Sequence, residues 1–141
     1  MTTVYLCGPI NGCSDAECKD WRAFAAETLT CRTYDPMVRD YRGRELEPGI
    51  AKEIVEFDKQ DVDACDVILV NYVKPSVGTS MEVLYAWERG KQIVVVAAAD
   101  AVLSPWLIYH SHRIVHSMAD ACAWIESQNQ PNNTKLTSSV G

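Results

Sequence analysis

Short apolar runs alternate along this chain with longer stretches in which apolar residues recur every three or four positions. The short runs end at glycine, proline or aspartate, and several are rich in β-branched residues, as is typical of strands. The predicted strands span residues 4–7, 31–34, 66–72, 92–97 and 114–115. The helical spacing predicts helices over residues 15–29, 48–64, 79–90, 103–110 and 117–127, with Pro48 in a first turn and Thr79 or Ser80 as a cap.

The regular alternation of strands and helices predicts a three-layer α/β fold of the flavodoxin or Rossmann-like kind. We expect a parallel sheet of about five strands with helices on both faces, because the run at 92–97 is apolar almost throughout. Residues 1–127 form one predicted domain. Residues 128–141 are polar, and we expect them to be disordered.

The 141 residues carry a formal net charge of −6, with 48% hydrophobic and 23% charged residues. An acidic chain is a poor partner for a nucleic-acid polymer, because binding such a polymer depends on neutralising its phosphates. No apolar run is long enough to cross a membrane, and no signal peptide is recognisable, so we expect a cytoplasmic protein. A small ligand is compatible with this charge.

The six cysteines are scattered and form no Cys-x-x-Cys pair, which favours reduced thiols over disulfides. His110, His112 and His116 are close in sequence, but no acidic or cysteine ligand accompanies them at a spacing known for metal sites. We therefore expect no metal and no cofactor. Trp106 is interpreted as a subunit-interface residue.

Glu82 follows the strand at 66–72 and a glycine-containing loop, and it is expected in the first turn of the next helix. In open α/β sheets ligands bind beyond the carboxyl ends of the strands, so this junction faces the expected crevice. The positive end of the helix dipole would favour an ionised, nucleophilic Glu82. The alternative is a surface glutamate that only compensates the dipole.

Three segments are expected to meet at this edge: residues 5–11, 58–66 and 76–82. They contain Tyr5-Leu6-Cys7-Gly8-Pro9, Asp58 eight residues before Asp66, and Gly78-Thr79-Ser80-Met81-Glu82. In these motifs the chain resembles the nucleoside 2-deoxyribosyltransferase family, which cleaves N-glycosidic bonds through a glutamate nucleophile.

The resemblance implies a role for each matching residue. Glu82 would attack the anomeric carbon and form a covalent glycosyl-enzyme, and Tyr5 would orient Glu82 by a hydrogen bond. Asp58 would contact the sugar or protonate the leaving base. The resemblance also implies that substrate lies against Gly8, Pro9, Ile10, Asn11 and Gly78, with Gly8 letting the base approach the backbone.

Ser76 occupies a position where the transferases commonly have an aspartate, and in this the chain is more similar to the 2′-deoxynucleoside 5′-monophosphate N-hydrolase branch. That branch implies that Ser76 binds the 5′-phosphate together with a serine from a neighbouring subunit, here Ser104, in a homodimer or higher homo-oligomer. The branch also has an arginine in the first loop, where this chain has Asn11. Arg22 or an arginine of the loop at 39–44 could supply that charge.

Several functions remain open at this stage. The enzyme would act on a nucleoside or its 5′-monophosphate, as a transferase or strictly as a hydrolase with water as acceptor. The same fold could instead serve as a non-catalytic nucleotide sensor. A flavodoxin-like redox module is disfavoured, because the first loop lacks the hydroxyl-rich pattern expected for a flavin phosphate.

Overall fold

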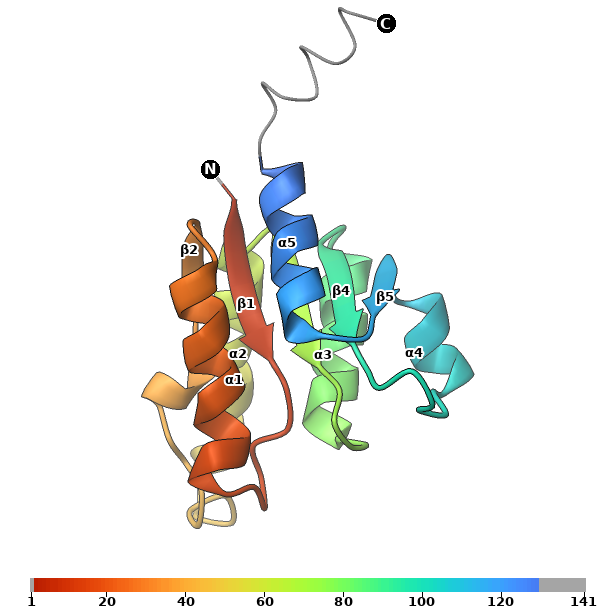
Figure 1. Cartoon of the computed structure of the whole chain (residues 1–141). Coiled ribbons are helices and arrows are strands. Elements are labelled where there is room, and N and C mark those ends of the chain that lie inside the picture. The colour runs from red at the N-terminus through yellow and green to blue at the C-terminus, as the bar shows by residue number, and fades with distance from the viewer. Residues whose placement is uncertain (1, 130–141) are drawn as a thin grey trace, which may run out of the picture.

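The computed structural model describes residues 2–129 and contains one five-stranded sheet in which every pair of neighbours is parallel. The strand order is β2-β1-β3-β4-β5, which is the predicted flavodoxin-like arrangement (Figure 1). The strands are β1 (Thr3–Cys7), β2 (Arg32–Tyr34), β3 (Val67–Asn71), β4 (Gln92–Val96) and β5 (Arg113–Val115).

Helices cover both faces of the sheet. In Figure 1, α1 and α5 lie in front of the strands, and α2 and α3 lie behind them. The helices are α1 (Asp15–Thr28), α2 (Ile50–Ala64), α3 (Val77–Glu88), α4 (Pro105–Tyr109) and α5 (Met118–Gln128), with a short 3-10 helix η1 (Pro36–Val38) before α2. The α/β class, the parallel sheet and the two helical layers predicted from the sequence are all confirmed.

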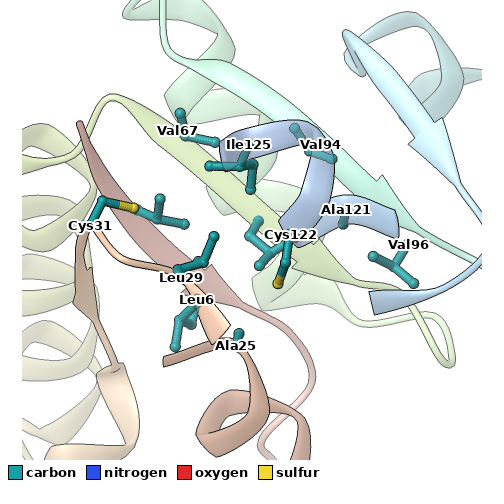
Figure 2. Close-up of a cluster of buried hydrophobic side chains, with 12 residues drawn as sticks. Leu6, Ala25, Leu29, Cys31, Val67, Val94, Val96, Ala121, Cys122 and Ile125 are labelled. Atoms are coloured by element: carbon teal, nitrogen blue, oxygen red, sulfur yellow. The ribbon is translucent and has the colours of Figure 1, made fainter. Parts of the chain in front are cut away.

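Successive residues of the central strands point into different layers, as the pleat of a strand requires. On β1, Leu6 packs into the layer of α1 and α5, where it shares a cluster with Cys122 and Ile125 (Figure 2). The neighbouring Tyr5 packs on the other side, with Val83 of α3. Tyr5 is fully buried, so the layer of α2 and α3 encloses its ring.

Two helix starts differ from prediction, and one of them moves Glu82. Helix α3 begins at Val77 and its cap is Ser76, whose side chain accepts a hydrogen bond from the backbone N–H of Thr79. Thr79 and Ser80 are therefore inside the helix, and Glu82 is its sixth residue, beyond the first turn. Helix α2 begins at Ile50, after a left-handed Gly49 (φ 83°), so the prediction that Pro48 lies in its first turn is wrong.

Other sequence predictions concern the thiols, the tail and the membrane. All six cysteines are free and buried, in agreement with the prediction of reduced thiols. No helix within residues 2–129 is both long and apolar enough to span a membrane. Of the tail predicted from residue 128, Gln128 ends α5 and Asn129 is its cap, and the residues beyond lie outside the described part of the chain.

Candidate active site

A hydrogen bond joins the sheet to α3 at the centre of the candidate site. The hydroxyl of Tyr5 on β1 donates to Oε2 of Glu82. Tyr5 is held in place because its ring is buried among β-branched side chains of the neighbouring strands. The carboxylate of Glu82 is therefore fixed at one oxygen by a donor on a rigid strand.

Glu82 and Asp58 line the same cavity, which has a volume of about 460 Å³ and lies between α2 and α3. Its mixed lining is Ile54, Val55, Asp58, Lys59, Val62, Gly78, Met81, Glu82, Leu84, Tyr85, Glu88 and Arg89. A Cβ atom at Gly78 would lie 4.0 Å from Oε1 of Glu82, the oxygen that Tyr5 does not hold. Glycine at this position therefore keeps the approach to that oxygen free of side-chain atoms.

Burial sets the protonation state of Glu82 and reverses the sequence-based expectation. Loss of solvation, and after it the negative charge of Asp58, raise the pKa of Glu82 to about 8, against a lowering effect of the Tyr5 hydrogen bond. This shift favours the protonated form of Glu82. The prediction of an ionised carboxylate favoured by the helix dipole loses its basis, because Glu82 lies past the first turn of α3.

Asp58 reaches the cavity from the middle of α2. Burial raises its pKa, and Arg39 opposes this rise through a hydrogen bond from Nη2 to Oδ1 of Asp58 at 3.3 Å. The expectation that residues 58–66 end at the carboxyl edge of the sheet is wrong. Asp66 precedes β3 and accepts a hydrogen bond from the backbone N–H of Thr3, at the amino edge.

The loop between β1 and α1 is held from inside by Arg22, which is 1% exposed. Its guanidinium donates to the carbonyl oxygens of Leu6 (3.3 Å), Gly8 (3.1 Å) and Cys18 (2.7 Å). The suggestion that Arg22 supplies charge to a phosphate is not supported, because its guanidinium is buried and already pairs with these carbonyls and with Asp35 at 3.6 Å.

Gly8 has a packing role in the same loop. A Cβ atom there would lie 2.9 Å from Cζ2 of Trp21, inside van der Waals contact. Internal packing thus excludes a side chain at Gly8, independently of any ligand.

Several predicted binding residues lie away from the cavity of Glu82. Pro9 is buried, Ile10 packs against a small cluster that contains Cys13 and Cys18, and Asn11 lines a separate hollow beside residues 43–48. Ser76 serves as the cap of α3. Ser104 caps α4 and lines a different cavity, together with Ser80 and Trp106.

Asp61 had no predicted site role, and Arg39 was one of the loop arginines that could supply charge to a phosphate. Arg39 Nη2 pairs with Oδ2 of Asp61 at 2.7 Å as well as with Asp58. The available signal was the spacing of Asp58 and Asp61, since residues three apart share one face of a helix. Arg42 is also paired, with Asp15 at 2.6 Å, so ion pairs tie this polar loop to both neighbouring helices.

The ring nitrogens of the three histidines lie next to backbone groups. His112 Nδ1 accepts a hydrogen bond from the N–H of Ile93 at 2.9 Å, and the rings of His110 and His116 lie within hydrogen-bond distance of backbone carbonyls. Within residues 2–129, no three His, Cys, Asp or Glu side chains gather in a group suited to hold a metal ion.

Comparison with protein families gives a match over almost the whole chain. The sequence model of the family described as nucleoside 2-deoxyribosyltransferase matches residues 4–134. The chain belongs to this family. Membership indicates an enzyme of N-glycosidic bond cleavage or transfer, with nucleosides or nucleotides as its substrates. A search of curated protein sequences gives no match.

Solved structures share the fold at low sequence identity. A conserved protein from Enterococcus faecalis V583 is 18% identical, with a TM-score of 0.76 over 91% of this chain and 99% of that protein. A 2-deoxyribosyltransferase from Bacillus psychrosaccharolyticus is 14% identical, with a TM-score of 0.67 over 85% of this chain and 90% of the other. The Clostridium botulinum CMP N-glycosidase BcmB is also 14% identical, with a TM-score of 0.61 over 90% and 99%.

Proposed function

We propose that this member of the family cleaves the N-glycosidic bond of a 2′-deoxynucleoside, or of its 5′-monophosphate, through a covalent glycosyl intermediate on Glu82. The observation that carries the proposal is the enclosure of Glu82 and Asp58 in one cavity, with Tyr5 bonded to Glu82. Two carboxyl groups with different surroundings are what acid-assisted displacement at a sugar carbon requires.

The proposed reaction has two steps. In the first, ionised Glu82 forms a bond to C1′ as the bond from C1′ to the base nitrogen breaks, and Asp58 gives its proton to the departing base. In the second, water or another base attacks C1′, the bond from C1′ to Glu82 breaks, and ionised Asp58 takes up the proton that the attacking group loses. In both steps Tyr5 donates its hydrogen bond to Oε2 of Glu82. The other oxygen, Oε1, faces the space beside Gly78.

The cavity supports a ligand of nucleoside size, since pockets for small molecules usually have volumes of roughly 300–1,000 Å³. Ser76 supports the 5′-monophosphate version of the proposal, because its oxygen accepts the capping hydrogen bond and its own proton remains to be donated. The ion pairs of Arg39 and Arg42 weigh against a phosphate role for these two arginines.

A homodimer or higher oligomer is part of the proposal. Met81, Trp106 and Tyr109 are 68%, 72% and 70% exposed, and they form an apolar surface along α3 and α4. Large exposed apolar patches mark interaction surfaces. Because Ser104 lies in this region, outside the cavity of its own Glu82, a neighbouring subunit would present it to the other site.

The test is turnover of a panel of deoxynucleosides, their 5′-monophosphates and the ribose counterparts, with and without an acceptor base. Release of free base is expected from the parent and from Glu27→Ala, an exposed glutamate on α1 that serves as the matched control. Glu82→Ala should release none. Rapid quenching of the parent should trap a glycosyl adduct on the peptide that contains Glu82, detected by its added mass.

Different outcomes separate the alternatives. Base exchange without hydrolysis identifies a transferase, and base release without an acceptor identifies a hydrolase. Tight binding by the parent with no release of base under any condition would instead indicate a nucleotide sensor and would refute the proposed function.

A further inference from the structure

Arg39 binds two carboxylates of α2 at once. It follows η1 in the chain, and its Nη2 lies 2.7 Å from Oδ2 of Asp61 and 3.3 Å from Oδ1 of Asp58. Its guanidinium also lies over the ring of Phe57, 5.2 Å from the centroid. The side chains of Arg39, Asp58 and Asp61 are 23%, 19% and 18% exposed, so this contact is largely screened from solvent.

Asp58 needs such a partner because it faces other acidic groups. The charge of Asp58 acts on Glu82, and that of Asp61 acts on Asp58. Removing a positive partner from a partly buried carboxylate leaves its charge poorly compensated. The titratable and charged groups facing Asp58 are Arg39 and Tyr41 of the loop before α2, Asp61 of α2, Glu82 of α3, Tyr5 and Cys7 of β1, and Arg22 of α1.

We propose that Arg39 is a positioning residue for the reaction proposed above: its guanidinium holds the carboxyl group of Asp58 toward the cavity and tunes its proton affinity in opposition to Asp61. The proposal rests on the proposed function, in which Asp58 is the proton donor. Arg39 and Asp61 touch Asp58 and each other, and they act on the substrate only through Asp58.

The opposite charges of the two partners give opposite effects on Asp58. Arg39 favours the ionised form of Asp58, whereas Asp61 disfavours it. Loss of Arg39 therefore raises the pKa of Asp58, and loss of the Asp61 charge lowers it. A side chain that only stabilised the fold would reduce activity at every pH without moving the profile in either direction.

The experiment measures the pH profile of kcat/KM for base release by the full-length protein. In Arg39→Gln the low-pH limb of this profile, the acid limb, should lie about one pH unit higher than in the parent. In Asp61→Asn it should lie at lower pH than in the parent. Arg39→Lys keeps the charge but loses the planar guanidinium, so the low-pH limb of its profile should move less than that of Arg39→Gln. The matched control is Arg32→Gln on β2, since Arg32 also lies over an aromatic ring (4.8 Å, Tyr34) but forms no ion pair within residues 2–129.

The outcomes distinguish this role from the proposed function. Base release by the parent with unshifted acid limbs in both Arg39→Gln and Asp61→Asn would refute the role of Arg39 and leave the proposed function standing. Shifts in the same direction for both variants would also refute it. No base release by the parent would refute the proposed function and, with it, the role assigned to Arg39.

Discussion

The hydroxyl of Tyr5 donates a hydrogen bond to Oε2 of Glu82, although the two residues lie 77 positions apart in the sequence. β1 carries the donor and α3 carries the acceptor, so the contact exists only when the sheet and its second helical layer have assembled. The ring of Tyr5 cannot turn away without leaving a buried position. The packing of the Tyr5 ring therefore keeps its hydroxyl in position to donate to Glu82.

Replacement of Tyr5 by phenylalanine removes the donor and keeps the packing of the ring. A hydrogen bond to a charged group contributes about 1.5–3 kcal/mol, so kcat/KM for base release should fall by roughly 10- to 100-fold. The same change should raise the pKa of Glu82 further, because the Tyr5 hydrogen bond lowers it. Steady-state kinetics of Tyr5→Phe beside Tyr34→Phe on β2 measures the effect. Equal rates for the two variants would show that the contact is not used.

The pH dependence of the parent should be bell-shaped, because the reactive form has Glu82 ionised and Asp58 protonated. At low pH both groups are protonated, and above the pKa of Glu82, about 8, both are ionised. Because Glu82 and Asp58 interact, the two pKa values that the profile reports belong to the pair of carboxyl groups and not to either residue alone. In Asp58→Asn the fall above pH 8 should disappear, and the remaining activity should rise to a plateau. Activity of the parent that continues to rise beyond pH 9 would argue against Asp58 as the donor.

Glu82 should lower the stability of the folded protein at alkaline pH. Its folded pKa of about 8 lies above the ordinary value of 4.5, so the folded state binds the proton more tightly than the unfolded state does. The stabilisation from that proton is present below pH 4.5 and is lost as the pH rises through 8. Glu82→Gln should therefore be more stable than the parent at pH 8.5, on the order of 4 kcal/mol. Urea unfolding at pH 5 and 8.5 tests this, and an equal difference between variant and parent at both values would contradict it.

Arg22 should be a major contributor to stability. Arg22→Met keeps much of the apolar stem but leaves the carbonyls of Leu6, Gly8 and Cys18 without their buried donors. Leaving buried acceptors without their donor costs about 1–3 kcal/mol. Urea unfolding should show a loss of this size for Arg22→Met and less than about 1 kcal/mol for the exposed Arg32→Met. Similar losses for both would mean that the three carbonyls find other partners.

Strands β1, β3 and β4 were predictable because each is a short apolar run, and the alternation of strands and helices then determines a parallel sheet. The start of α3 was not, since Ser76, Thr79 and Ser80 can all cap a helix. Gly78 was interpreted as a loop residue, whereas it lies in the first turn of the helix. The predicted cap was three or four residues too late in the sequence, so Glu82 was expected almost one turn closer to the start of the helix. Its expected interaction with the helix dipole was therefore too strong.

The candidate site was predictable only in part. The expected sheet edge grouped the segments that contain Tyr5, Asp58 and Glu82, but the choice of Tyr5 and Asp58 within those segments depended on the family resemblance. The burial of Arg22 could not be inferred, since arginine is usually exposed and its partners are backbone carbonyls that any sequence supplies. The protonation of Glu82 depends on how completely the helices exclude water, which is a property of packing.

The burial of Arg22 limits how far the backbone beside it can adapt. The carbonyls of Leu6 and Gly8 accept hydrogen bonds from this internal cation, so this stretch of backbone cannot change its course without breaking buried hydrogen bonds. The cavity of Glu82 is lined instead by side chains of α2 and α3. Altered ligand selectivity should accordingly be easier to obtain by changing those side chains than by redesigning the backbone around Gly8.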